Sequence, residues 1–128
     1  MKYLVDTCAF LWFTAGSTKL SVRARQTIED PNHSMYLSTA SAWEIAIKYA
    51  QKKLILPEPP VEFVPRQLEA NGFGHLNVTL HHALLAGELP FLHKDPFDRM
   101  LVAQAIVESL PIITSDSMFD SYPPLRIW

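Results

Sequence analysis

Two stretches of the sequence decide the fold: KYLVD at residues 2–6 and PIITSD at residues 111–116. In each, a short apolar run typical of a buried strand leads into an aspartate, Asp6 or Asp116. A carboxylate at the end of a buried strand serves no packing purpose, so its cost is accepted where it binds something. Taken singly, each aspartate could equally be a helix cap or a turn residue.

Outward from these stretches, candidate strands alternate with candidate helices. We expect strands at residues 2–5, 35–38, 77–80, 111–114 and 125–128. We expect helices at residues 21–30, from 39 or 41 to about 54, and at 61–71, 81–89 and 95–109. This alternation favours the α/β class, with a central parallel sheet covered on both faces. Ligands of such sheets bind beyond the carboxyl ends of the strands.

Two further acids lie near the starts of expected helices. Glu44 follows Ser41 by three positions, so it could complete a capping box, and it could also pair with Lys48 one turn later. Asp98 follows Asp95 by three positions, which fits a cap and a favourable charge in the first helical turn. Each of these acids, taken alone, is explained without any ligand.

The four acids together are harder to explain by capping alone. Asp6 and Asp116 end strands, and Glu44 and Asp98 follow strand-end loops, so all four are expected on one rim of the sheet. Carboxylates gathered there would repel one another and raise each other's pKa values. A hard divalent cation such as Mg²⁺ or Mn²⁺ removes that penalty, because it prefers oxygen ligands. The joint pattern therefore predicts a metal site.

The bulk properties are those of an ordinary globular chain. The sequence has 128 residues, 48% of them hydrophobic, which fits a single domain over residues 1–128. Its net charge of −2 gives no general attraction for nucleic acid, so a phosphate-bearing substrate needs local basic residues or bound cations. Asp6 interrupts the first apolar run too early for a signal peptide, and a single cysteine fits a reducing compartment. We therefore expect a soluble cytoplasmic protein without a membrane segment.

Four segments together resemble the PIN-domain nucleases, and among them the VapC-like toxins of type II toxin–antitoxin pairs. They are YLVDT at residues 3–7, SAWEI at residues 41–45, DPFDRML at residues 95–101 and ITSD at residues 113–116. Each segment alone would be weak, but their order and spacing are specific. The resemblance covers nearly the whole chain.

The resemblance implies a three-layer α/β/α PIN-like fold and an endoribonuclease that hydrolyses RNA phosphodiester bonds with Mg²⁺ or Mn²⁺. It implies that the catalytic metal site consists of Asp6, Glu44, Asp98 and Asp116. It also implies supporting polar roles for the hydroxyls of Thr7, Thr114 and Ser115. For partners, it implies a cognate antitoxin and either a homodimer or a toxin–antitoxin hetero-oligomer.

Other chemistry-bearing residues have plainer expected roles. The five histidines show no spacing typical of a zinc site, so we expect none of them to be a ligand. We expect Cys8 to be a small buried side chain rather than a nucleophile. Basic residues form two groups, Lys19 with Arg23 and Arg25, and Lys48 with Lys52 and Lys53. Either group could be a solvated helix face or a binding site for RNA phosphates. We predict that the group of Lys48, Lys52 and Lys53 contacts RNA.

Other functions share part of this pattern. A phosphoacceptor or phosphatase domain also gathers aspartates around Mg²⁺, but it needs a second acid close to the first-strand aspartate, and no acid follows Asp6 until Glu29. Such a domain also has a lysine after a late strand, where this chain has Asp116. An inactive PIN-like scaffold would lack one of the acids, and none is missing. An RNA-processing nuclease without an antitoxin would use the same site and stays an open alternative.

Overall fold

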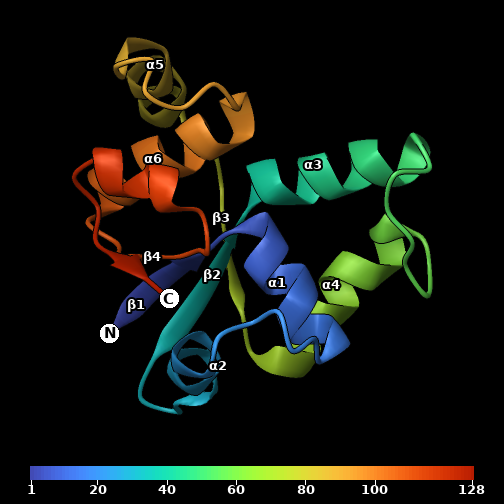
Figure 1. The fold of residues 1–128 in the computed structure, drawn as a ribbon. Helices are drawn as coiled ribbons and strands as arrows, with labels where there is room; N and C mark the ends of the chain where they lie inside the picture. Colours follow the sequence, from blue (N-terminus) through green and yellow to red (C-terminus); the bar gives the residue numbers. More distant parts are fainter.

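A parallel sheet organises the molecule. The computed structural model describes residues 1–128 and contains one five-stranded sheet in the order β3-β2-β1-β4-β5 (Figure 1). The strands are β1 (Lys2–Val5), β2 (Ser34–Ser38), β3 (Gly74–Leu76), β4 (Ile112–Ile113) and β5 (Arg126–Ile127). Every pairing between neighbours is parallel. The predicted parallel sheet is confirmed, and all its strands bring their carboxyl ends to the same edge.

Helices cover both faces of the sheet. They are α1 (Thr7–Ala15), α2 (Val22–Glu29), α3 (Thr39–Ala50), α4 (Pro60–Asn71), α5 (Leu80–Glu88) and α6 (Pro96–Glu108), with a short 3-10 helix, η1 (Ser117–Ser121), after β4. In Figure 1, α5 and α6 lie on one side of the sheet, and α1, α2 and α4 lie on the other. The expected three-layer α/β/α arrangement is confirmed.

Two apolar cores, one on each face, follow from the alternation of side chains along the strands. On β1, Val5 packs into the core shared with α1, α2 and α4, whereas Leu4 packs into the core shared with α5 and α6. On β4, Ile113 and Ile112 divide between the two cores in the same way. All four side chains are almost fully buried, as expected for parallel strands covered on both faces.

The third strand differs from its predicted position. We expected it at residues 77–80, but β3 ends at Leu76, and Thr79 instead caps α5 by accepting a hydrogen bond from the His82 N–H at 3.2 Å. Pairing with β2 fixes the strand: Tyr36 lies opposite Gly74, where any side chain would collide with the Tyr36 ring. The prediction was wrong because the capping role of Thr79 outweighs the β-propensity of the segment.

The start of α3 also differs from expectation. Ser38, rather than Ser41, caps the helix, its hydroxyl accepting a hydrogen bond from the Ala40 N–H at 3.0 Å. Ser41 lies inside the helix, and its buried hydroxyl has no hydrogen-bond partner. The suggested capping box between Ser41 and Glu44 is therefore wrong, and the Glu44 carboxylate is not tied to the helix start.

Two predicted helix boundaries are confirmed by their caps, and a third helix ends earlier than predicted. Helix α4 ends at Gly72, which is left-handed with φ 67°. Helix α6 begins after Asp95, whose side chain accepts a hydrogen bond from the Phe97 N–H at 2.9 Å. Helix α3 ends at Ala50, before a left-handed Lys52. None of the helices combines the length and apolar character that a membrane crossing needs.

Candidate metal-binding active site

Asp6 lies where β1 passes directly into α1. Its Oδ1 accepts a hydrogen bond from the Ala9 N–H at 2.7 Å, so the carboxylate caps the helix as well as ending the strand. The residue is 7% exposed. Burial raises the pKa of Asp6 to about 6, the Thr114 hydroxyl and the Ala9 N–H oppose the shift, and the charges of Glu44 and Asp116 add to it. The carboxylate thus lacks a compensating positive charge.

Asp116 follows β4 and begins η1. Its Oδ1 accepts a hydrogen bond from the Met118 N–H at 2.9 Å, and its backbone N–H donates to the Thr114 hydroxyl at 3.1 Å. Its Oδ2 lies 2.8 Å from Nε2 of His93. Burial acts to raise the pKa of Asp116, but the Met118 N–H, His93 and Arg126 outweigh it, so the pKa is lowered. Asp116 therefore stays ionised more readily than Asp6 or Asp98.

Asp98 lies in the first turn of α6, with its Oδ2 3.0 Å from Nε2 of His93. Burial, followed by repulsion from Asp95, raises the pKa of Asp98 to about 7, against the opposing effect of His93. Asp6 and Glu44 contribute further repulsion. A carboxyl group with such a pKa is only partly ionised at neutral pH without a cation beside it.

Glu44 supplies the fourth carboxylate from α3. It is 6% exposed, and its Oε2 accepts a hydrogen bond from the Lys48 Nζ at 2.8 Å. The pairing one helical turn apart that the sequence suggested is therefore present. The two side chains differ in accessibility, since the lysine is exposed and the glutamate is buried. Lys48 thus anchors Glu44 from the solvent side without closing off the other acids.

Electrostatic coupling joins the four predicted acids into one cluster. The charges of Glu44 and Asp116 raise the pKa of Asp6. The charges of Asp6 and Glu44 likewise raise the pKa of Asp98. The capping roles of Asp6 and Asp116 are real, and they coexist with this clustering because each cap uses Oδ1. These couplings place the four predicted acids near one another, and their role as a metal site stays a prediction.

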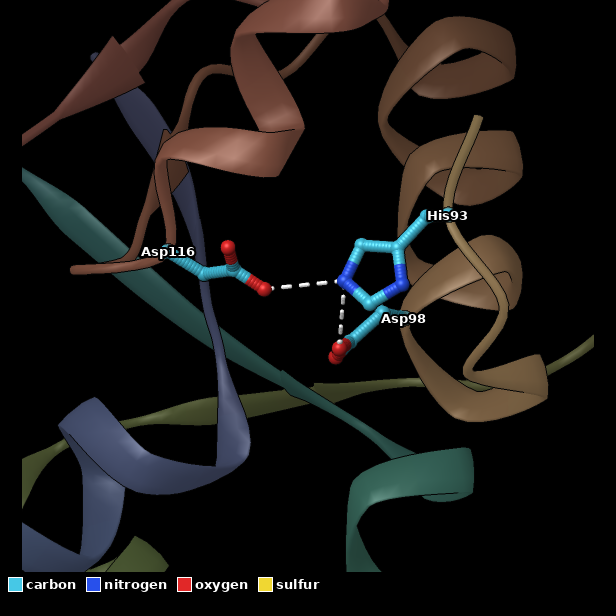
Figure 2. Close-up of side chains that lie close together, drawn as sticks. All are labelled: His93, Asp98 and Asp116. Atoms are coloured by element: carbon cyan, nitrogen blue, oxygen red, sulfur yellow. Dashed lines mark hydrogen bonds and ion pairs between the residues drawn. The ribbon is translucent and has the colours of Figure 1, made fainter. Parts of the chain in front are cut away.

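The sequence reasoning missed His93. This residue precedes Asp95 in the loop between α5 and α6, and its Nε2 lies between Asp98 and Asp116 (Figure 2). One donor atom from each of these three side chains falls within 4.8 Å of the others. The only signal in the sequence was its position just before the DPFDRML segment, because no second histidine stands at a metal-ligand spacing.

The hydroxyl residues expected to support the acids divide into two kinds. Thr114 is fully buried and contacts both Asp6 and the backbone of Asp116. Thr7 is buried, and its hydroxyl has no hydrogen-bond partner, so it has an unused polar atom beside Asp6. Ser115 is exposed, and no hydrogen bond joins its hydroxyl to the acids. The structure thus brings two of the three hydroxyl residues to the cluster.

Comparison with known proteins assigns the family. A model of the PIN domain matches residues 3–124. The chain belongs to the PIN domain family. Within that family, it is 43% identical over 58 residues to "Ribonuclease VapC16" of Mycobacterium tuberculosis, a match that spans 45% of this chain and 41% of the mycobacterial protein. The match thus covers less than half of that relative's length.

Solved structures share the fold of this PIN domain. VapBC2 from Rickettsia felis, bound to a DNA fragment from their promoter, aligns with a TM-score of 0.73 over 98% of this chain and 97% of that chain, at 17% identity. DNA-bound VapBC from Salmonella typhimurium aligns with a TM-score of 0.67 over 98% and 96%, at 18% identity. FitAcB from Neisseria gonorrhoeae aligns with a TM-score of 0.63 over 98% and 96%, at 18% identity. At these identities the likeness concerns the fold.

A groove opens beside the acids of this PIN domain. Its volume is about 630 Å³, and most of its lining is apolar, contributed by α1, by α3 and by the segment after α3. Thr7, Cys8 and Lys48 lie at its acidic end, and Lys53 lies along its wall. Lys52, in contrast, is exposed beyond the end of α3 and does not line the groove.

Cys8 departs from expectation, because it is exposed rather than buried. It sits on the groove side of α1, directly after Asp6 and Thr7. The pKa of its thiol is raised to about 11, first by partial desolvation and then by the charge of Asp6. A thiol with such a pKa stays protonated at neutral pH, and a protonated thiol is a poor nucleophile. This is consistent with the prediction that Cys8 is not a nucleophile.

The donor set fits a hard divalent cation. Two nearly buried carboxylates, Asp6 and Glu44, carry charge with little access to water, and Asp98 and Asp116 lie at the same edge. Oxygen donors of this kind are what Mg²⁺ and Mn²⁺ prefer. Repulsion among the acids is also the penalty that a bound cation would remove.

Proposed function

We propose that this PIN domain is an endoribonuclease that depends on Mg²⁺ or Mn²⁺ and acts as the toxin of a toxin–antitoxin pair. The observation that carries the proposal is the cluster of Asp6, Glu44, Asp98 and Asp116 at the carboxyl edge of the sheet, two of them nearly buried and mutually repelling. The name of the mycobacterial relative, a ribonuclease, supports RNA as the substrate.

In this proposal, the residues divide the work of phosphodiester hydrolysis. Asp6, Asp98 and Asp116 would hold the cation, which supplies a water of lowered pKa and neutralises charge on the phosphate. Glu44 would complete the cation site or orient the attacking water, and its ion pair with Lys48 holds it in place. Thr114 would keep Asp6 and Asp116 in position through the contacts of its hydroxyl.

The direct test is RNA cleavage by the purified chain. We expect cleavage with Mg²⁺ or Mn²⁺, none with a chelator, and a loss of at least a hundredfold in Asp6→Asn. Glu29→Gln, an exposed acid on α2, is the matched control and should cleave normally. Cleavage that survives chelation would overturn the metal-dependent mechanism.

We also propose that a cognate antitoxin covers the groove beside the acids. The groove is lined mainly by apolar side chains, so it suits an apolar segment of a protein, and it reaches the acids at Thr7 and Cys8. A segment lying there would block access of RNA to the cluster. The chain shares its fold with VapBC structures and with a toxin–antitoxin complex from Klebsiella pneumoniae, which supports a toxin–antitoxin assignment.

The antitoxin proposal is tested in growing cells. Expression of the chain alone should arrest growth, and co-expression of the product of an adjacent reading frame should relieve the arrest. Ala15→Tyr places a bulky side chain at an exposed position of the groove, so it should reduce that relief while cleavage in vitro continues. If expression is harmless and no neighbouring product binds, an RNA-processing nuclease without an antitoxin becomes the better assignment.

The basic end of α3 is our proposed contact for RNA phosphates. Lys52 and Lys53 are exposed, whereas Lys48 is already paired with Glu44. Reversing both exposed charges should weaken RNA binding. It should also reduce the slope of log affinity against log salt concentration by the equivalent of about one phosphate contact for each lysine. The matched control is the equal charge change Lys19→Glu with Arg23→Glu. If only the control pair weakens binding, α2 and its preceding loop hold the RNA instead.

A further inference from the structure

We propose that His93 is a positioning residue: its Nε2–H donates a hydrogen bond to the Asp116 carboxylate, beside Asp98, and so fixes the position of Asp116 without itself binding a cation. The inference deepens, and rests on, the proposed nuclease function. It concerns the role of the imidazole. Because His93 lies beside Asp98 and Asp116, its position alone would suggest that it is a metal ligand (Figure 2).

The hydrogen bonds of the ring fix its tautomer. The backbone N–H of Asp95 donates to Nδ1 of His93 at 3.2 Å, so Nδ1 presents a lone pair and carries no proton. The ring proton is then on Nε2, which donates to Oδ2 of Asp116 at 2.8 Å. Oδ2 of Asp98 lies 3.0 Å from the same nitrogen, at ion-pair distance. The hydrogen bond to Asp116 agrees with this tautomer.

A metal-ligand role would require the opposite arrangement. Coordination through Nε2 needs the lone pair on that atom and hence the proton on Nδ1. In this structure an Nδ1 proton would face the Asp95 N–H, so two donors would oppose each other. Asp95 cannot easily turn away, because its side chain caps α6 through the Phe97 N–H. The ring is therefore set up to donate.

The backbone around His93 is held from two sides. The hydroxyl of Tyr122 accepts a hydrogen bond from the His93 N–H at 2.9 Å and donates to the Pro90 carbonyl at 2.8 Å. The ring of Phe119 packs edge-on against the imidazole, with 5.7 Å between ring centroids. These contacts fix where the imidazole enters the cluster.

Arg99 holds the start of the same loop. This buried arginine donates to the carbonyls of Ala86, Leu89 and Pro90 at 2.7, 2.8 and 2.9 Å. Arg99 thus holds the end of α5 and the start of the loop. Asp98, from α6, and Asp116, from the end of β4, both lie at Nε2 of His93, and one donor atom from each of the three side chains falls within 4.8 Å of the others.

The first test is nuclear magnetic resonance of the imidazole nitrogens in the full chain labelled with ¹⁵N-histidine. The ring of His93 is assigned by the signal that disappears in His93→Gln. We expect the neutral tautomer with the proton on Nε2, both with chelator and with saturating Mg²⁺. A proton on Nδ1 in either state would overturn the proposal.

The second test measures Mn²⁺ affinity by electron paramagnetic resonance. Removing the donor in His93→Phe should weaken Mn²⁺ binding by about tenfold, the usual effect of losing a group that orients metal ligands. His93→Gln keeps an N–H donor and should recover most of that loss, and His81→Gln, an exposed histidine on α5, should bind as the wild type does. Thermal unfolding of each variant checks that it is folded.

The outcomes separate this inference from the proposed function. Electron spin echo modulation from a coordinated ¹⁴N in the wild type, or unchanged Mn²⁺ affinity in folded His93→Phe, would overturn the role of His93 while leaving the nuclease proposal in place. Mn²⁺ binding that is unaffected by Asp6→Asn would instead overturn the proposed metal site. The imidazole tautomer would still report whether His93 donates to Asp116.

Discussion

At the scale of single residues, Asp6 shows how one side chain can serve the fold and the site together. One of its oxygens caps α1, and its charge remains nearly buried beside other acids. The cap stabilises the helix, whereas the buried charge destabilises the protein until a cation is bound. The residue therefore combines a favourable and an unfavourable contribution that substitution can separate.

Asp6→Asn should stabilise the protein in chelator while abolishing cleavage. Asparagine is as good a helix cap as aspartate, so the bond from Ala9 is kept and only the buried charge is lost. The pKa raised to about 6 corresponds to a gain on the order of 3 kcal/mol in the free energy of unfolding at pH 7.5. Urea unfolding measures it, with Glu29→Gln as control. A clear loss of stability would show that the charge is already compensated.

The same carboxyl groups determine how stability depends on pH. Asp6 and Asp98 have folded-state pKa values of about 6 and about 7, above the ordinary aspartate value of 3.8, so the folded chain binds more protons than the unfolded chain between about pH 4 and 7. In chelator, their contribution to stability is present below pH 4 and is lost as pH rises through 7. Saturating Mg²⁺ should reverse the trend, because it binds the deprotonated site. Equal pH profiles with and without Mg²⁺ would contradict this assignment.

At the scale of elements, the loop between α5 and α6 depends on Arg99 more than on its own sequence. The arginine donates to the carbonyl of Ala86 near the end of α5 and to those of Leu89 and Pro90 in the loop, and it stacks against the ring of Phe91. The contacts to Ala86 and Leu89 are buried, so these two carbonyls depend on this donor. The loop in turn presents His93 to the acids, so α6 supplies both an acid and the brace for the neighbouring histidine.

Arg99→Met should destabilise the protein by about 3 kcal/mol, because buried carbonyls lose their donor. Hydrogen exchange should accelerate in the loop and at the start of α6 more than in β1. Arg23→Met, an exposed arginine on α2, is the control and should change stability by less than about 0.5 kcal/mol. If the two variants unfold alike, Arg99 does not brace the loop.

At the scale of the whole molecule, the sheet and its acidic edge could be predicted from the sequence because both depend on local patterns. Apolar runs that end in Asp6 and Asp116 identify the strands, and parallel pairing then sends those residues to one edge. Asp98, in the first turn of α6, follows the same rule, whereas Glu44 lies in the second turn of α3 because that helix begins at Thr39. These features need no knowledge of long-range packing beyond the order of the elements.

The features that escaped prediction depend on contacts between distant segments. His93 reaches the acids through Tyr122 and Arg99, neither of which forms a motif with it. The third strand is fixed by the fit of Gly74 under Tyr36, which sequence periodicity does not reveal. Cys8 looked like a core residue, but the turn of α1 directs it to the groove. Tertiary packing decides each of these positions.

The most direct measurement of the central claim is the position of Mn²⁺ located by anomalous diffraction from crystals grown or soaked with the ion. The account predicts an anomalous peak coordinated by oxygens of Asp6, Asp98 and Asp116, with His93 alongside as a donor to Asp116 and not as a ligand. A peak elsewhere on the surface, or no peak at saturating Mn²⁺, would contradict it.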